Sequence, residues 1–177
     1  MSREDIKAVL EPRSVAVVGA SRQEGSVGKR ILMNIIESGF KGPVYPINPK
    51  ASELCGLKCY PSILDVEQPV DLAVIAVPAA IVPEVARQAG EKGVKGLVVI
   101  SAGFREIGQE GANLERELLD ACRKYGMRMV GPNCLGVINT SVPINTTFAS
   151  SKALPGRIAF LSQSGALCSA VLDWAPM

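Results

Sequence analysis

The 177-residue sequence contains no histidine. Without an imidazole, the chain cannot supply a Ser–His or Cys–His nucleophile pair, a histidine general base or a phosphohistidine carrier. Any chemistry that this chain performs alone must therefore use other groups.

Aromatic residues are also scarce, at 5% of the chain, and the formal net charge is only +2. Lys and Arg are scattered, and no basic run is longer than Lys29-Arg30. A nucleic-acid surface needs clustered cations to neutralise phosphates and, for single strands, aromatic rings to stack bases. We therefore expect no nucleic-acid partner.

Long hydrophobic runs are absent as well. The longest, from Leu72 to Pro83, is too short to span a bilayer and contains Pro78. The N-terminal stretch 1–13 lacks the apolar core of a signal peptide. We expect no membrane contact and a cytoplasmic location.

Five cysteines, an odd number, stand at irregular spacing at positions 55, 59, 122, 134 and 168. Together with the missing export signal, this favours free thiols in a reducing compartment. Cys55 and Cys59 form a CxxxC motif, but no second pair and no histidine completes a zinc site. We expect no metal bound by this chain.

Apolar and polar patterns alternate between strand and helix, and 47% of the residues are hydrophobic. Strands are expected at 14–18, 44–47, 71–76, 96–100 and 127–130, and helices at 27–38, 80–92 and 111–125. Strands separated by helices of this length form right-handed crossovers. The predicted fold is α/β, with a doubly wound parallel sheet.

Ligands of such sheets lie at the carboxyl ends of the strands. The residues at these ends are small, polar or Gly/Pro-punctuated: 19–21, 48–50, 77–79, 101–104 and 131–136. Loops of this kind let an extended ligand lie close to the backbone.

The first strand runs into a glycine-rich turn, Gly19 to Gly28, which opens a helix. Unpaired backbone N–H groups and the helix dipole make such a turn a phosphate cradle. An NAD site places an acidic residue near the end of the second strand, but here that position holds Lys50. The cation favours a nucleotide with an extra ribose phosphate, namely coenzyme A (CoA) or NADP.

Beyond Gly136 the pattern changes. Residues 137–151 have no helical period, 152–156 read as a linker, and 157–161 with 166–174 predict a new strand and helix. One such unit cannot bury its own faces. We therefore expect a first domain over 1–151 and the start of an incomplete second domain over 157–177, which would expose apolar side chains that a homodimer could cover.

Five motifs in this order are familiar: VAVVGASRQEGSVG, VYPINPK, SAGFREIG, GPNCLGVIN and GRIAFLSQSGAL. Over roughly residues 8–175 the chain resembles the CoA-binding region of ADP-forming acyl-CoA synthetases of the acetate–CoA ligase type, relatives of the succinyl-CoA synthetase α subunit. The resemblance implies a Rossmann-like domain followed by flavodoxin-like domains, and an ATP-grasp module as a partner subunit or fused segment.

The resemblance also implies a reaction in which acyl-CoA, phosphate and ADP give acid, CoA and ATP through a phosphohistidine. This chain has no histidine, so we expect it to be inactive alone and assign no catalytic residue. It implies CoA contacts at Gly19, Ala20, Ser21, Gly25, Ser26, Val27, Gly28, Asn48, Lys50, Val77, Pro78, Ser101, Ala102, Gly103, Asn133 and Cys134. Within this set, Lys50 would face the ribose 3′-phosphate, and Asn133 and Cys134 would lie near the thiol end.

Two other functions remain open on the residues alone. The same turn and Lys50 could hold NADP in an oxidoreductase domain, although the spacing from Gly19 to Gly25 is longer than GxGxxG allows. The chain could also be a non-catalytic CoA-sensing regulatory subunit.

Overall fold

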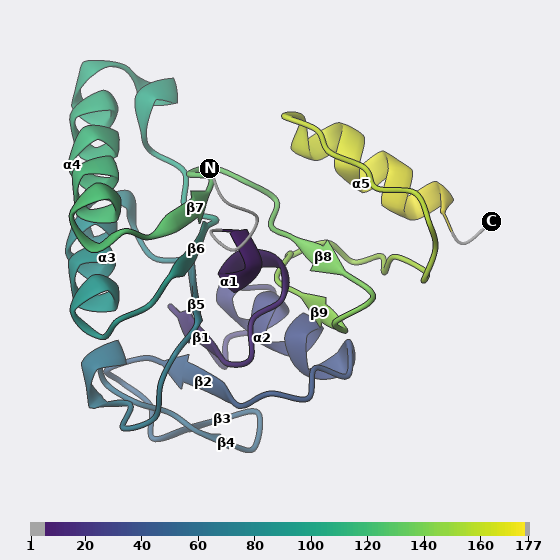
Figure 1. Ribbon diagram of the computed structural model, residues 1–177, viewed down its shortest axis with the longest axis horizontal. Coiled ribbons are helices and arrows are strands. Elements are labelled where there is room, and N and C mark those ends of the chain that lie inside the picture. The colour runs from purple at the N-terminus through teal and green to yellow at the C-terminus, as the bar shows by residue number, and fades with distance from the viewer. Residues whose placement is uncertain (1–5, 176–177) are drawn as a thin grey trace.

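The computed structural model describes residues 6–175, and its centre is a five-stranded parallel sheet (Figure 1). The strands are β1 (Val15–Val18), β2 (Val44–Ile47), β5 (Leu72–Ile75), β6 (Gly96–Val99) and β7 (Arg128–Val130), in the spatial order β2-β1-β5-β6-β7. All five predicted strands are confirmed, each within a residue or two of the expected bounds. The chain therefore has a Rossmann-like α/β fold.

Helices cover both faces of the sheet, as Figure 1 shows. One face packs against α2 (Val27–Glu37) and the other against α3 (Val82–Glu91) and α4 (Gln109–Tyr125). Each face of the sheet has its own hydrophobic core, and alternate residues of β1 belong to one or the other. Val15 and Val17 lie in the core on the α2 side, and Ala16 and Val18 lie in the core on the α3 side. A strand buried on both faces has to be apolar throughout, which explains the continuous hydrophobic runs.

Short elements complete the domain. They are the helix α1 (Lys7–Leu10), the hairpins β3 (Glu53–Leu54) with β4 (Leu57–Lys58) and β8 (Ile138–Asn139) with β9 (Ile144–Asn145), and the 3-10 helices η2 (Ile63–Asp65), η3 (Ala79–Ile81) and η4 (Arg105–Ile107). The sequence patterns did not predict α1 or the hairpins, because two-residue strands and one-turn helices have no readable period. The expected helix over 80–92 is divided into η3 and α3.

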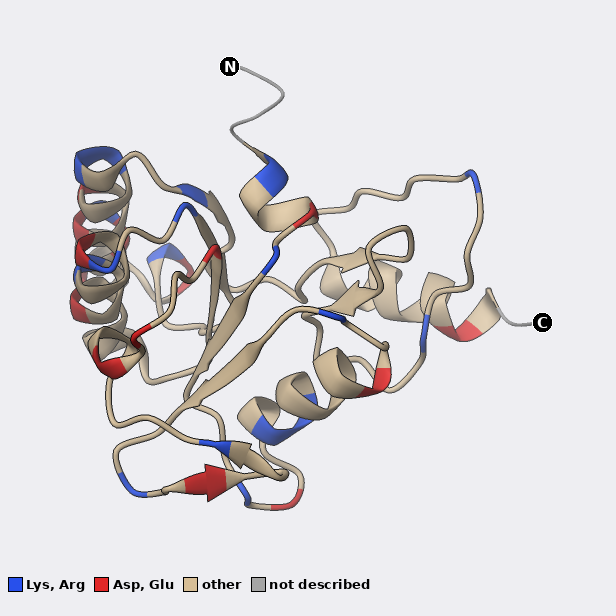
Figure 2. Cartoon of the chain, turned by 60° about the horizontal axis from the view of Figure 1, so that its bottom comes forward, with Lys and Arg blue, Asp and Glu red and all other residues tan. Residues whose placement is uncertain are grey.

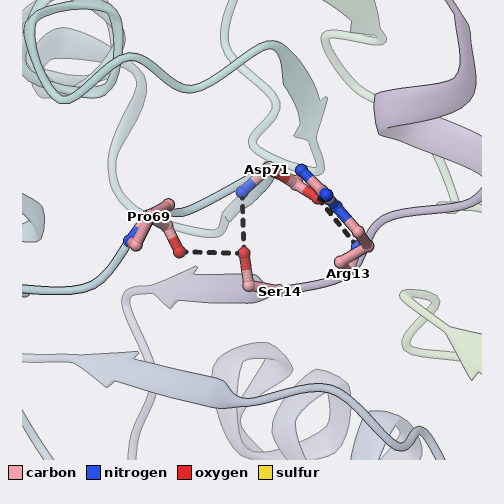
Figure 3. A network of polar contacts seen from close by, with 4 residues as sticks. All are labelled: Arg13, Ser14, Pro69 and Asp71. Carbon is pink, nitrogen blue, oxygen red and sulfur yellow. Dashed lines mark hydrogen bonds and ion pairs between the residues drawn. The ribbon is translucent and has the colours of Figure 1, made fainter.

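A polar network fastens β1 to β5 at the edge of the sheet where these strands begin (Figure 3). The Ser14 hydroxyl donates to the Pro69 carbonyl at 3.0 Å and accepts from the Asp71 N–H at 2.9 Å. Arg13 donates to Asp71 Oδ2 from its backbone N–H and from Nε. Burial alone would raise the pKa of Asp71, but the hydrogen bonds and charge of Arg13 outweigh it and hold that pKa below its ordinary value.

The segment after residue 151 lies apart from the sheet (Figure 1). The predicted second helix is confirmed as α5 (Gly165–Trp174), but the predicted strand over 157–161 is wrong, since these residues form no ladder. A strand exists only where a neighbour takes its backbone hydrogen bonds, and no strand of residues 6–175 lies beside this one. Residues 1–5 of the expected first domain and 176–177 of the expected second lie outside the described residues.

Candidate functional site

The candidate site is the edge of the sheet where the five strands end. The chain runs from β1 to β2 on one side and then crosses to β5 on the other, so the order reverses at β1. Ligands of open α/β sheets bind at such a switch point. The fold therefore brings Gly19, Asn48 and Val77, which follow these three strands, to one edge, as the sequence predicts.

Close packing explains two of the glycines in the turn. Gly19 has φ +91°, and a Cβ there would lie 2.3 Å from the Ala76 carbonyl oxygen. A Cβ on Gly28 would lie 1.9 Å from the Gly19 carbonyl oxygen. Only hydrogen fits at either position, so the start of α2 presses directly against the end of β1.

The turn leaves several backbone donors without a partner. The N–H groups of Glu24, Gly25, Val27 and Gly28 have no acceptor among residues 6–175. These groups stand at the positive end of the α2 dipole, an arrangement that suits an anion such as a phosphate.

The two serines of the turn have structural partners. Ser26 caps α2: its hydroxyl donates to the Gln23 carbonyl at 2.8 Å and accepts from the Lys29 N–H at 3.3 Å. The Ser21 oxygen accepts from the Gln23 N–H at 3.1 Å, which leaves its proton free to donate. The backbone and Ser21 are thus better placed than Ser26 to contact a phosphate.

Asn48 ties the end of β2 to the glycine turn. Its Nδ2 donates to the Ala20 carbonyl at 2.8 Å, and its Oδ1 accepts from the Lys50 N–H at 2.8 Å. Each side-chain polar atom therefore has one partner within the protein, and through these bonds Asn48 positions its neighbours. The Lys50 side chain is exposed, and no ion pair links it to any residue in 6–175.

The loops after β5 and β6 are also joined. The Ser101 hydroxyl donates to the Val77 carbonyl at 2.6 Å and accepts from the Val77 N–H at 3.1 Å. Ser101 is buried, so it holds Val77 and the exposed Pro78 in place. Ala102 is exposed and Gly103 half-buried; the Gly103 N–H donates to Glu106 at 2.7 Å, a bond that lowers the pKa of Glu106.

The loop after β7 contains Asn133 and Cys134. Asn133 is exposed, has φ +54°, and donates its N–H to the Ser101 carbonyl at 2.9 Å. The Cys134 thiol donates to the Val99 carbonyl at 3.2 Å, and burial raises its pKa to about 11. A thiol that stays protonated at neutral pH is a poor nucleophile.

A cavity of about 200 Å³ opens beside Gly19, between the ends of β1 and β2 and the elements η2, η3 and α3. Its lining includes the predicted residues Gly19, Asn48 and Val77, and several that sequence reasoning missed: Ile47, Pro49, Pro61, Ser62, Ile63, Ile81, Val85 and Gln88. Four of these missed residues, Ile63, Ile81, Val85 and Gln88, lie on η2, η3 and α3. The one available signal was the helical spacing of Ile81, Val85 and Gln88 just after a strand end.

Other features of the described chain bear on its partners. Within residues 6–175, no group of three or more His, Cys, Asp or Glu could hold a metal ion, and no helix has the length and apolar character needed to cross a membrane. All five cysteines are free thiols. Acidic and basic residues are interspersed over the helices and loops (Figure 2).

The parallel sheet, the switch point and the glycine turn define a nucleotide-binding α/β domain. The family model described as a CoA binding domain matches residues 13–140, more than half of the chain. The chain therefore belongs to the CoA-binding domain family, and the resemblance stated from its motifs is confirmed.

Curated proteins that are similar in sequence also have names that refer to CoA. The chain is 54% identical over 170 residues to the acetate–CoA ligase [ADP-forming] I of Archaeoglobus fulgidus, covering 96% of this chain and 24% of that protein. It is 46% identical to the α subunit of the acetate–CoA ligase [ADP-forming] I of Pyrococcus furiosus, covering 96% of this chain and 37% of the subunit. The chain thus spans about a quarter of the first relative's length and somewhat more than a third of the second's.

A solved structure is similar to this chain in both fold and sequence. An acetyl-coenzyme A synthetase 1 of Ca. Korarchaeum cryptofilum, solved in complex with phosphate and ADP, matches with a TM-score of 0.91 and 46% identity. The match covers 96% of this chain and 36% of that one.

Proposed function

We propose that this chain binds coenzyme A along the carboxyl edge of its sheet. The diphosphate lies over the turn from Gly19 to Gly28, and Lys50 faces the 3′-phosphate. The pantetheine arm passes Val77 and Ser101 toward Asn133. Two features together carry the proposal. Backbone N–H donors at the start of α2 have no acceptor, and Lys50, which follows β2, is exposed and forms no ion pair within residues 6–175.

In this proposal the chain is the CoA-binding part of an ADP-forming acyl-CoA synthetase. Its relatives are named for acid–CoA ligation with ADP formation, and the chain spans only part of their length. Because the chain has no histidine, a phosphohistidine step needs a residue from elsewhere. The partner that binds ADP would be an ATP-grasp subunit or fused module.

The segment from 157 onward belongs, in the same proposal, to a second unit that begins after a linker at 152–156. Its apolar side chains support this, because Ile158 is 95% exposed and Leu161 97% exposed. A surface of this kind suits contact with another folded unit or with a second copy of the chain. The free thiols suit a cytoplasmic location.

Thermal unfolding with CoA, dephospho-CoA, NADPH and ADP tests the binding proposal. A ligand at about 100 times its dissociation constant stabilises the fold by roughly 2.7 kcal/mol, which is about 5–10 °C for a chain of this size. We expect a clear shift with CoA, a smaller one with dephospho-CoA and none with NADPH. A shift with NADPH but not with CoA would overturn the proposal.

A further inference from the structure

The cavity beside Gly19 continues directly from the proposed phosphate site. Val18 and Gly19 belong to its lining, together with Val85 and Gln88 of α3. A nucleotide whose phosphates lie over the glycine turn therefore has this space, of about 200 Å³, within reach of its base.

The walls of the cavity are mainly apolar. Ile47 and Ile63 are buried parts of the core, whereas Ile81 is 48% exposed on η3. Val77 and Val85 also contribute half-buried surface. A flat aromatic ring that enters the cavity would cover this exposed apolar area and gain free energy by doing so.

Three polar side chains line the same cavity: Asn48, Ser62 and Gln88. Asn48 bonds the Ala20 carbonyl and the Lys50 N–H, both at 2.8 Å. Gln88 is held only weakly, since its Oε1 accepts from the Ser62 hydroxyl at 3.3 Å and its Nε2 donates to Glu84 at 3.3 Å. Both distances exceed the ordinary range, so the amide can exchange these partners for a ligand at little cost.

We propose that this cavity takes the adenine of CoA and that Gln88, supported by Ser62, selects this base. This inference rests on the proposed binding of CoA at the adjoining turn. A glutamine amide pairs with adenine in a bidentate way: its oxygen accepts from the N6 amino group and its nitrogen donates to a neighbouring ring nitrogen. Asn48 and Gln88 both offer a donor and an acceptor in one plane, and of the two Gln88 has the longer hydrogen bonds to the protein.

The test compares CoA with 1,N6-etheno-CoA, in which the N6 amino hydrogens are lost and N1 is blocked. The natural chain should bind CoA about tenfold more tightly, as expected when the amide loses its hydrogen bonds to the base. Gln88→Leu keeps the size of the side chain and removes both hydrogen-bonding groups. This substitution should weaken the binding of CoA about tenfold and leave the affinity for etheno-CoA unchanged. The preference for CoA should therefore disappear.

Gln109→Leu is the matched control, because Gln109 also bonds a side chain one helical turn away, Asn113, but lies at the start of α4. It should keep the full preference. Equal binding of both ligands by the natural chain would overturn the base selection while leaving CoA binding intact. A preference that persists in Gln88→Leu would also overturn it, since the discrimination would then be steric. Failure of both ligands to bind would overturn the binding proposal itself.

Discussion

The Asn48 amide nitrogen donates to the Ala20 carbonyl oxygen at 2.8 Å, which joins the end of β2 to the glycine turn after β1. The same side chain accepts from the Lys50 N–H. One residue therefore sets the position of the proposed phosphate cradle relative to the proposed 3′-phosphate partner.

Asn48→Ala should reduce CoA affinity about five- to tenfold, because the turn and Lys50 lose one shared hydrogen-bonded anchor. Isothermal titration calorimetry measures this directly. Asn113→Ala, on the exposed surface of α4, is the control and should bind CoA normally. An unchanged affinity of Asn48→Ala for CoA would show that the Asn48 side chain does not position any group that contacts CoA.

Lys50→Ala should weaken CoA binding by about 1.5–3 kcal/mol, the range for a charge-assisted hydrogen bond. Dephospho-CoA, which lacks the 3′-phosphate, should bind both forms almost equally. Lys41→Ala removes another exposed lysine and should change neither affinity. Equal losses for the two ligands would contradict the assignment of Lys50 to the 3′-phosphate.

Gly28→Ala and Gly25→Ala should differ sharply in stability. A Cβ on Gly28 collides with the Gly19 carbonyl oxygen, so α2 must move from β1, at a cost of about 3 kcal/mol or more. Gly25 has φ +75° but open space around it, so alanine there costs only about 1–2 kcal/mol of backbone strain. Urea denaturation gives both values, and a reversed order would refute the packing argument.

Arg13→Ala should destabilise the protein near neutral pH and much less in acid. The pKa of Asp71 is lowered in the folded chain, so the stabilisation by Arg13 is present above the ordinary pKa of 3.8 and is lost as pH falls through the lowered value. Free energies of unfolding of the two chains, measured from pH 7 down to pH 3, should therefore converge.

The control for that series is Arg123→Ala, which breaks an exposed pair with Asp120 on α4. Exposed pairs contribute little, so its stability should stay near that of the natural chain at each pH. A difference for Arg13→Ala that does not shrink in acid would place the effect in packing instead of charge.

Alkylation at pH 8 should reveal different reactivities among the cysteine thiols. Burial raises the pKa of Cys122 and of Cys134 to about 11, so both stay protonated, whereas Cys55 is exposed in the β3–β4 turn. Mass spectrometry after brief treatment with iodoacetamide should find Cys55 modified, and Cys122 and Cys134 modified only in denaturant. Rapid labelling of Cys134 in the folded chain would contradict its described environment.

The sequence alone determined the sheet and the place of its ligand edge. Runs such as Leu72 to Ile75 are apolar at every position because both faces of their strands are covered, and that pattern can be read without a structure. The glycine turn and Lys50 were likewise readable, because backbone conformation and charge are local properties.

Tertiary structure decided the rest. Ser62 and Gln88 lie 26 positions apart and meet only because η2 folds against α3. The sequence placed Asn48 at the ligand edge but did not show that its amide joins the Ala20 carbonyl to the Lys50 N–H. The expected strand at 157–161 is absent because a strand depends on its neighbour as much as on its own residues. Such pairings join distant parts of the chain, so local patterns could not show them.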